Sequence, residues 1–495
     1  LSVLIIMGCA VTLMSRAISS STGSSTDAAL DEDSSTRHSS WFWGLWGLFS
    51  FGGGGGRSHG NRRSGAHPYG IGLNAQYPRV PLTPSSLYEI PGAMSHVGDK
   101  SDQYALLRKE IDTKMEKEPH QPVEQKLSFA PITLDNGVPI PYDIYNCPDE
   151  PPTDYPYAWN LLSILKAWPP DDPTPRPEIY QGLCVFDYTN EQDLAKAYKY
   201  RSAELPFVVR HDPQVQQAVQ RWNTPHYLSR MLGNVRHRTE YSESNHFLYW
   251  NPPPRQRGQN RNRKNLNPNN PMKKPRSRLT QQQENTPQDW KQPTEMMRMT
   301  FDDWLQKADL KDDSSLGPDM PHWYFRLIGC GETGPEGQCD NGSSEYLFDE
   351  LTFFQPKPSL YMVQPKEQKG IHCRFGMKGV IAENHFDGSR NAIVVLGGER
   401  RYILSHPEQC PFLSLLPKGH PSARHSAVDW SDPDLDAYPE FALAKGNEIV
   451  MQAGDVLYLP TNWFHYIISL SLNYQCNTRS GIGEEYMDPI HHCGF

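Results

Sequence analysis

Three kinds of feature are missing from this sequence, and each absence narrows the possible classes of protein. No internal repeat is evident, which argues against a fold built from sequence repeats. Basic residues do not predominate, because 48 Lys and Arg stand against 57 Asp and Glu and the net charge is −9. The chain as a whole is therefore not built to hold nucleic acid. The third missing feature is a long apolar run, because the one at the N-terminus is too short to span a bilayer as it stands.

Proline, glycine and polar residues are abundant instead. The 495 residues include 44 Pro and 37 Gly, and the mean hydropathy is −0.66. A chain of this length allows two or three domains of ordinary size, and the composition is unusual for one compact body. We therefore expect long linkers, above all in residues 21–130 and 251–293.

Several polar and apolar segments leave the location of the protein open. Residues 1–14 are apolar and uncharged, which fits the h-region of a signal peptide or the tail of a signal anchor; a mobile apolar tail with no targeting role is the alternative. An aromatic patch at residues 41–51 would settle in a membrane interface or dock on the folded body. The basic insertion at 251–293 would touch an anionic surface or remain a solvated loop.

The nine cysteines allow two interpretations of the compartment. Without Cys9 the set is even, as in a protein of the secretory lumen, and Cys330 and Cys339 flank a loop that a disulfide would close. Asn341 opens a glycosylation sequon. Reduced, buried cysteines are the alternative. We predict a protein in the lumen of the secretory pathway or anchored to its membrane, with a cytoplasmic or nuclear location as the alternative.

Helix signals lie before residue 310. Asp212 precedes a proline and opens a helix, Thr224 opens a second helix that Gly233 ends, and Thr300 begins a capping box. A short buried strand is expected over residues 205–210.

Residues 359–480 have the pattern of an all-β sandwich or barrel, because helical periodicity disappears and short apolar runs alternate with turn signals. A hairpin is expected over 391–404 with its turn at Gly397 and Gly398. A second strand pair is expected over 448–459, and a long strand region over 464–476.

Two histidines and an aspartate in this region have the spacing of a metal site. His385 and Asp387 lie two residues apart, so their side chains share one face of a strand. His465 follows a predicted strand and Pro460, which places it at the mouth of a barrel on a partner strand across from the pair. Two imidazoles and one carboxylate leave half of an octahedral iron open, which is the ligand set of the non-haem Fe(II) oxygenases. Hydrogen-bonded rim histidines without a metal are the competing interpretation.

Residues 371–480 resemble the JmjC, or cupin-like, domain of 2-oxoglutarate-dependent oxygenases. Residues 376–387, 399–404, 420–434 and 454–465 carry the likeness. It is nearest to the asparaginyl hydroxylase that inhibits hypoxia-inducible factor, and a weaker likeness extends upstream. The resemblance implies a mainly β fold, a double-stranded β-helix (jelly-roll or cupin) barrel with flanking N-terminal helices and strands.

The resemblance also implies a cosubstrate site. Arg400 stands where the hydroxylase has the lysine that pairs with the far carboxylate of 2-oxoglutarate. Arg401 is expected to face outward, and the two exchange roles if the register shifts by one residue. Asn391 and Asn477 match asparagines near the cosubstrate. Ala382 replaces a threonine, so one cosubstrate hydrogen bond is missing or comes from another residue.

Two residues match positions near the substrate. Arg424 matches an arginine that helps to hold the target side chain, and His425 stands where the hydroxylase has glutamine, a departure that leaves the target residue open. The alternative for Arg424 is a loop arginine paired with Asp429 or Asp432.

The metal ligands His385, Asp387 and His465 thus predict a 2-oxoglutarate-dependent dioxygenase that uses Fe(II) and O2. Hydroxylation of a protein or peptide side chain is the first interpretation. Demethylation of lysine or arginine is the second, and a non-catalytic cupin-like binding domain is the third. No specific nucleic-acid partner is expected, and membrane anchoring would involve the N-terminus.

We divide the chain accordingly into six parts. These are a signal peptide or signal anchor (1–20), a mostly disordered low-complexity segment (21–130), the N-terminal part of the catalytic module (131–250), a disordered basic insertion (251–293), the barrel (294–480) and a C-terminal tail (481–495).

Overall fold

The computed structural model describes residues 100–117, 129–251, 290–309, 317–329 and 346–495. The N-terminal apolar run, the aromatic patch, most of the basic insertion, Cys330, Cys339 and Asn341 lie outside these ranges, so what we expect of them stays a prediction. Within the described ranges, no helix has both the length and the apolar character that crossing a membrane requires.

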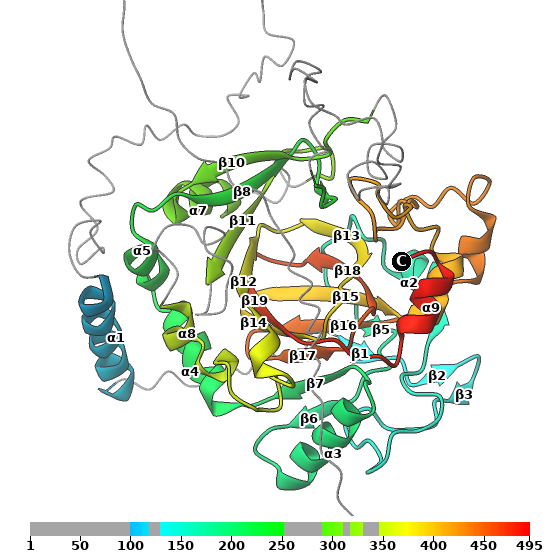
Figure 1. The fold of residues 1–495 in the computed structure, drawn as a ribbon, viewed down its shortest axis with the longest axis horizontal. Helices are drawn as coiled ribbons and strands as arrows, with labels where there is room; N and C mark the ends of the chain where they lie inside the picture. The colour runs from blue at the N-terminus through cyan, green and yellow to red at the C-terminus, as the bar shows by residue number, and fades with distance from the viewer. Residues whose placement is uncertain (1–99, 118–128, 252–289, 310–316, 330–345) are drawn as a thin grey trace, which may run out of the picture. The chain divides into compact units, whose positions relative to one another are not determined.

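Two sheets carry the β-rich part of the described chain (Figure 1). The larger sheet runs in spatial order through β10 (Glu295–Met299), β8 (His237–Ser242), β11 (His322–Gly329), β12 (Gln368–Gly376), β19 (Asn473–Ser480), β14 (Asn391–Gly397), β17 (Val456–Leu459), β7 (Phe207–Arg210) and β6 (Val185–Asp187). The smaller runs through β4 (Trp159–Asn160), β16 (Lys445–Gln452), β15 (Glu399–Ser405), β18 (Phe464–Ser469), β13 (Ile381–Phe386) and β9 (His246–Phe247). The eight strands β12 to β19 are divided equally between the two sheets, which confirms the predicted jelly-roll barrel with N-terminal strands that extend it.

From β12 to β19, strands that follow each other in the chain pass from one sheet to the other, except β15 and β16, which are paired in the smaller sheet. β14 and β15 lie where a hairpin is expected and turn at Gly398, whose φ is +67°. However, β14 pairs with β17 and β19, whereas β15 pairs with β16 and β18. The consecutive strands β16 and β17 are likewise in different sheets. The predicted strand positions are correct and the predicted hairpin pairings are wrong, because a jelly roll places successive strands on opposite walls.

The capping signals mark helices on the outer side of the larger sheet. In α4 (Pro213–Trp222) the Asp212 side chain accepts a hydrogen bond from the backbone nitrogen of Gln214 at 2.8 Å. In α7 (Phe301–Ala308) the Thr300 hydroxyl accepts one from the backbone of Asp303 at 3.1 Å. α5 (Tyr227–Leu232) ends at Gly233, as expected, but it begins after His226 and not at Thr224, whose hydroxyl donates to the carbonyl oxygen of Gln220. α4 packs against β14, and α7 packs against β11.

The remaining elements are short or lie at the edges. They are α1 (Lys100–Lys117), α2 (Leu161–Ala167), α3 (Glu191–Ser202), α8 (Leu347–Glu350), α9 (Met487–His492), β1 (Ala130–Pro131), β2 (Leu134–Asp135), β3 (Val138–Pro139) and β5 (Glu178–Ile179). α2 lies against β16.

Helix α1 lies inside the segment that the sequence predicts to be mostly disordered. Its buried residues Tyr104, Leu107 and Ile111 are spaced three and four apart, so they share one face. The Tyr104 hydroxyl donates a hydrogen bond to the Glu350 carboxylate at 2.5 Å. This contact is 246 residues away in sequence, so local composition gave no sign of it.

Glu350 is a buried carboxylate that joins four helices. Its side chain accepts hydrogen bonds from Nε of Arg221 at 2.7 Å, Nε1 of Trp222 at 3.2 Å and the hydroxyl of Tyr227 at 2.8 Å, besides that of Tyr104. α1, α4, α5 and α8 therefore meet at a single negative charge. A buried charge with this many donors is compensated, and removal of the carboxylate would leave the Arg221 cation with only Asp112 of the described ranges, 3.5 Å from its Nη1, as an acidic partner.

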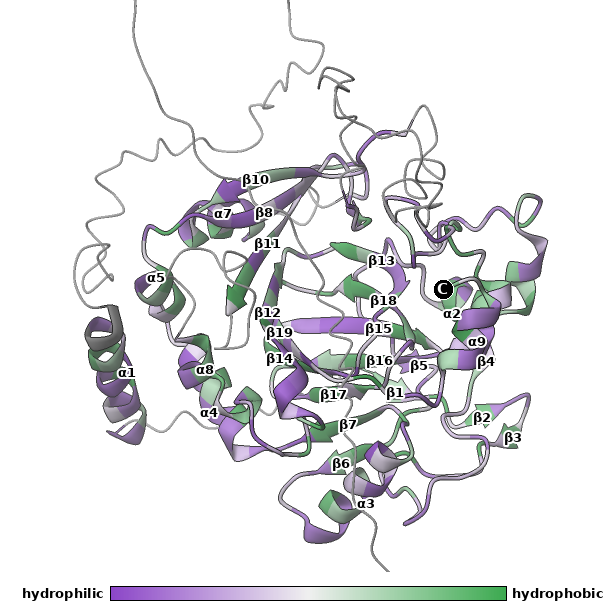
Figure 2. Ribbon diagram, in the orientation of Figure 1, coloured by the Kyte–Doolittle hydropathy of each residue, from purple (hydrophilic) through white to green (hydrophobic). Residues whose placement is uncertain are grey.

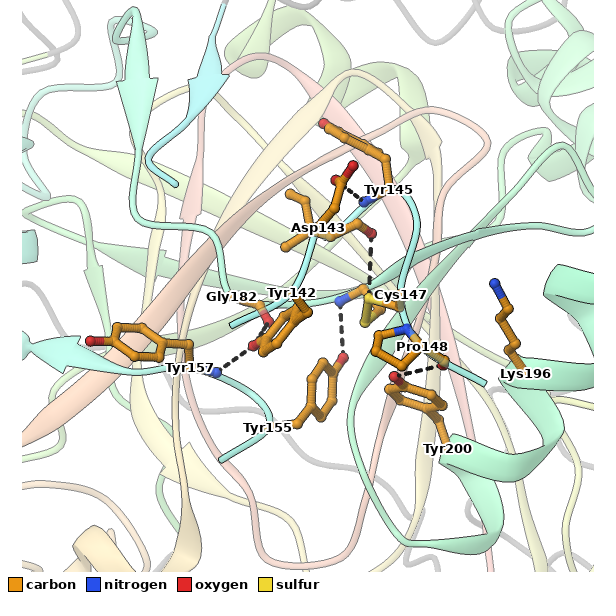
Figure 3. Close-up of a disulfide and its surroundings, with 12 residues drawn as sticks. Tyr142, Asp143, Tyr145, Cys147, Pro148, Tyr155, Tyr157, Gly182, Lys196 and Tyr200 are labelled. Carbon is orange, nitrogen blue, oxygen red and sulfur yellow. Dashed lines mark hydrogen bonds between the residues drawn. A yellow bond between two sulfur atoms is a disulfide. The ribbon is translucent and has the colours of Figure 1, made fainter. Parts of the chain in front are cut away.

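Three disulfides join all the cysteines of the described ranges. They are Cys147–Cys184, Cys373–Cys476 and Cys410–Cys493, which are 37, 103 and 83 residues apart in sequence. Figure 3 shows Cys147 among tyrosines, of which Tyr155 accepts a hydrogen bond from the backbone nitrogen of Cys184 at 2.9 Å. The second disulfide ties β12 to β19 at directly opposed positions. None of these pairings was predicted from the sequence.

Candidate active site

His385, Asp387 and His465 come together at one end of the smaller sheet. His385 is the penultimate residue of β13, Asp387 follows that strand directly, and His465 lies near the start of β18. Their ligand atoms all lie within 4.8 Å of one another, and no other such group of three occurs in the described ranges. His385 and His465 are register partners on neighbouring strands. His465 therefore comes from the same sheet and not from across the barrel as expected.

Backbone carbonyls fix the orientation of both imidazoles. Nδ1 of His385 lies 2.7 Å from the carbonyl oxygen of Glu383, and Nδ1 of His465 lies 3.1 Å from that of Trp463. When each Nδ1–H donates to its carbonyl, Nε2 is left with a free lone pair. Burial lowers the pKa of both rings, so both are neutral, which is the form that binds a metal.

Cationic neighbours keep the Asp387 carboxylate ionised. Burial alone would raise its pKa, but the positive charges of Arg479 and of Arg424 oppose burial, and the pKa is lowered. Arg479 Nη2 donates to Oδ2 of Asp387 at 2.7 Å, and Nδ2 of Asn391 lies 3.3 Å from the same oxygen. Two neutral imidazoles and one ionised carboxylate fit Fe(II) with open coordination positions.

The strand β15 carries two adjacent arginines whose side chains point to opposite faces of the sheet. Its first part is hydrophilic among hydrophobic strands (Figure 2). Arg400 is fully buried and donates hydrogen bonds to the side chains of Asn473, Gln475 and Tyr324 and to the backbone oxygen of Arg374. All four acceptors are neutral, and no carboxylate of the described ranges lies within ion-pair distance of it. Because a buried charge is costly without a counter-charge, this guanidinium fits an anionic cosubstrate.

Arg401 has the opposite environment. Its Nε lies 2.5 Å from Oε2 of Glu448, and its guanidinium lies 4.3 Å from the ring centre of Trp168. It faces away from the barrel interior, as the sequence predicts, but Trp168 covers it and it is fully buried. The expected register of β15 is therefore correct.

The other candidate residues line one cavity of about 290 Å³ together with the three ligands. Nδ2 of Asn477 donates to Oδ1 of Asn391 at 2.8 Å. Arg424 donates to the carbonyl of Phe386 at 3.3 Å, and its Nη1 lies 3.9 Å from Asp387, so it has neither of the aspartate partners that the alternative interpretation gives it. The cavity thus brings the other candidates together around the three possible metal ligands, whereas Arg400 is not among the residues that line it.

His425 supports a metal ligand from the side. Its ring stacks on that of His385, with 5.0 Å between centroids and 23° between planes. Burial and the Arg424 charge lower its pKa to about 4, so the ring is neutral. Ala382 lines the same cavity but has no hydroxyl to offer to a cosubstrate.

Several residues of the cavity were missed in the sequence. Tyr324 and Arg326 on β11 and His372 and Arg374 on β12 line it, as does Arg479 on β19. The signal that reveals them is alternation with period two, because residues two apart on a strand share a face. The sequence could not show which strands would face the iron site.

A second charged cluster lies behind β13, centred on His246. Nδ1 of His246 lies 2.5 Å from Oε1 of Glu383, and Nε2 lies 3.5 Å from Oδ1 of Asp171. Burial alone would lower the pKa of His246, but these carboxylates, with a contribution from Asp429, raise it to about 10. His246 is therefore a cation at neutral pH and holds the loop of Asp171 against β13.

Comparison with known proteins gives one family and several relatives. A family model described as a cupin-like domain matches residues 194–479. tRNA wybutosine-synthesizing protein 5 is 33% identical over 19% of this chain and 29% of the Gallus gallus protein, and 24% identical over 36% of this chain and 52% of the Danio rerio protein. The lysine-specific demethylase JMJ31 of Arabidopsis thaliana is 32% identical over 19% of this chain and 18% of its own length. The matches thus span about half the length of these relatives or less.

Proposed function

Because this chain belongs to the family of proteins with the cupin-like domain, we propose that it is a Fe(II)- and 2-oxoglutarate-dependent oxygenase that hydroxylates a protein side chain. The observation that carries the proposal is the convergence of His385, Asp387 and His465 within 4.8 Å, with both imidazoles neutral and the carboxylate ionised. A specific resemblance to the asparaginyl hydroxylase remains a prediction, since the relatives named above are other proteins of the family.

In this reaction one oxygen atom of O2 enters the substrate C–H bond and the other enters 2-oxoglutarate, which leaves as succinate and CO2. Bound iron supplies the oxygen chemistry. The protein supplies three ligands on one side of the metal, and Arg479 and Asn391 hold the Asp387 carboxylate in place. Arg400 supplies the positive charge for the far carboxylate of the cosubstrate, and Asn391 and Asn477 lie at the cavity wall beside it.

The test combines metal content with succinate release. The wild-type protein should retain Fe(II) and convert 2-oxoglutarate to succinate in the presence of O2, and both properties should fall to background in His385→Ala. A matched control is His420→Ala, which removes an imidazole outside the cavity. Unchanged succinate release in His385→Ala would refute the proposal.

Demethylation of a lysine is a second candidate because the Arabidopsis thaliana relative is named for it. Mass spectrometry of captured peptides separates the two reactions, since hydroxylation adds an oxygen atom and demethylation removes a methyl group as formaldehyde. A non-catalytic cupin-like domain would bind 2-oxoglutarate or iron without succinate release.

We also propose that the protein works in an oxidising compartment, the lumen of the secretory pathway. The support is that every cysteine of the described ranges is paired, and disulfides persist in oxidising compartments. Protease treatment of intact microsomes that carry a C-terminally tagged chain tests this. Protection that is lost with detergent is the expected result, and digestion without detergent would exclude the lumen.

A further inference from the structure

Two arginines face each other across the wall of the cavity. Arg326 on β11 and Arg374 on β12 are direct register partners, and both line the cavity that holds the metal ligands. Like charges directly opposite each other on neighbouring strands repel. A sheet that keeps such a pair on its ligand-facing side needs an anion there to offset the repulsion.

The two guanidinium groups have unused hydrogen-bonding capacity. Arg326 pairs with Glu240, but its Nε is buried and has no hydrogen-bond partner. Arg374 donates to the carbonyl oxygen of Cys373 at 3.1 Å, and no carboxylate of the described ranges lies within ion-pair distance of it. Burial and the Arg326 charge lower the pKa of Arg374 to about 9, so it is a cation at neutral pH, and Glu240, which is paired with Arg326, offsets only part of its charge.

The charges of the residues that line the cavity also indicate that it binds an anion. Five arginines line it but only two carboxylates, Glu240 and Asp387. Asp387 is already engaged by Arg479 and is a metal ligand candidate. Arg400, which would hold the cosubstrate, is not among the residues that line the cavity. Glu240 offsets at most one of the two charges of Arg326 and Arg374, so a positive charge remains beyond the metal and cosubstrate that we propose.

We propose that Arg326 and Arg374 bind a carboxylate of an acidic side chain that a polypeptide substrate inserts into the cavity. This inference rests on the proposed function and adds the chemical class of the substrate. Two guanidinium groups recognise a carboxylate through charge-assisted hydrogen bonds. A cavity of about 290 Å³ admits a single side chain beside the cosubstrate, and a net charge of −9 does not favour a long nucleic acid. A methylated lysine is a cation, which these arginines repel.

The experiment measures equilibrium binding of fluorescent peptide pools to the iron-loaded protein with 2-oxoglutarate under anaerobic conditions. The pools have Glu, Gln or Lys at a fixed central position and random neighbours, and a single-stranded RNA oligonucleotide is the fourth probe. The variants are Arg374→Gln and Arg326→Gln, and the matched control is Arg298→Gln on the edge strand β10, where the arginine is exposed. Binding of 2-oxoglutarate is measured separately for each protein.

We expect the wild type to prefer the Glu pool over the Gln pool by about tenfold or more, as one charge-assisted hydrogen bond allows. The preference should disappear in Arg374→Gln and Arg326→Gln and persist in Arg298→Gln, with 2-oxoglutarate affinity within about threefold of wild type. Equal binding of the Glu and Gln pools, or tighter binding of RNA, would overturn the proposal. So would a loss of 2-oxoglutarate affinity in Arg374→Gln as large as that in Arg400→Met, because the anion would then be the cosubstrate.

The oxygenase function and the anion site can be refuted separately. If the wild type binds no 2-oxoglutarate but still selects acidic peptides through Arg374, the oxygenase function is wrong and the anion site stands. If it releases succinate but shows no preference for acidic peptides, the function stands and the anion site is wrong.

Discussion

Replacing each of the adjacent arginines of β15 by methionine should separate ligand binding from stability. Arg400→Met removes a cation whose partners are all neutral, whereas Arg401→Met removes the partner of the buried Glu448. The two substitutions are identical in chemistry and one residue apart. They differ only in the face of the sheet, so each is the control for the other.

The expected effects on stability and on 2-oxoglutarate affinity follow from the hydrogen-bond and ion-pair partners of each arginine. Arg401→Met leaves Glu448 buried with one backbone donor, from Tyr180 at 2.8 Å, and breaking such a pair costs about 3–5 kcal/mol. That is a large share of a total stability of about 5–15 kcal/mol. Arg400→Met leaves neutral acceptors unpaired but also removes an uncompensated buried charge, so its effect on stability should be smaller, at about 1–2 kcal/mol. Its effect on 2-oxoglutarate should be larger, because a charge-assisted pair is worth about 2–3 kcal/mol, or roughly 30- to 150-fold in affinity.

Urea unfolding measures the first quantity, and calorimetric titration of 2-oxoglutarate into the metal-loaded protein measures the second. Arg401→Met should unfold at lower urea concentration but, where folded, bind 2-oxoglutarate nearly as the wild type does. The reasoning fails if Arg400→Met binds 2-oxoglutarate within about threefold of the wild type, or if Arg401→Met loses the cosubstrate while keeping its stability.

Further predictions concern the candidate metal site, the Glu350 carboxylate that joins four helices, and the dependence of stability on pH. Asp387→Ala should lose bound iron and succinate release while the circular dichroism spectrum persists, because two remaining ligands hold Fe(II) poorly; retained iron would contradict this. Glu350→Ala should lower the free energy of unfolding by about 3–5 kcal/mol, since the buried Arg221 cation then keeps, among the described residues, only Asp112, 3.5 Å away, as an acidic partner, and an unchanged urea midpoint would exclude this role. Because the pKa of His246 is raised from 6.5 to about 10 in the folded state, its stabilising contribution is complete below pH 6.5 and is lost as the pH rises toward 10. His246→Asn should flatten the dependence of the melting temperature on pH in that window. If the dependence is the same in the variant and the wild type, the charge of His246 does not stabilise the fold as we expect.

Local signals in the sequence determined the positions of several elements and indicated the three residues that come together as a candidate metal site. The cap at Asp212 needs only side chains next to the helix start, so the predicted start was correct. The spacing of His385 and Asp387 likewise fixes a shared strand face wherever the strand lies. The pattern of short apolar runs predicted an all-β sandwich or barrel, because each strand has to bury its apolar residues, and the family resemblance implied the jelly-roll barrel.

Pairing between distant segments was decided only in three dimensions. The sequence placed β14 and β15 correctly but paired them as a hairpin, since turn residues do not reveal that the chain crosses to the opposite wall. Helix α1 depends on Tyr104 reaching Glu350, 246 residues away. The disulfides join cysteines up to 103 residues apart, which spacing alone does not pair.

The residues in and around the cavity also divide into those that the sequence indicated and those that only the tertiary structure revealed. The family resemblance singled out Arg400 as a cosubstrate candidate by its place after the His-x-Asp pair, and strand alternation predicted that Arg401 faces the other way. Nothing in the sequence singled out Arg326 and Arg374. Only the register of β11 against β12 places these two cations opposite each other on the wall of the cavity that holds the candidate metal ligands. Side-chain chemistry and short-range periodicity are properties of the chain, whereas the electrostatic field of a pocket depends on which strands the tertiary fold brings together.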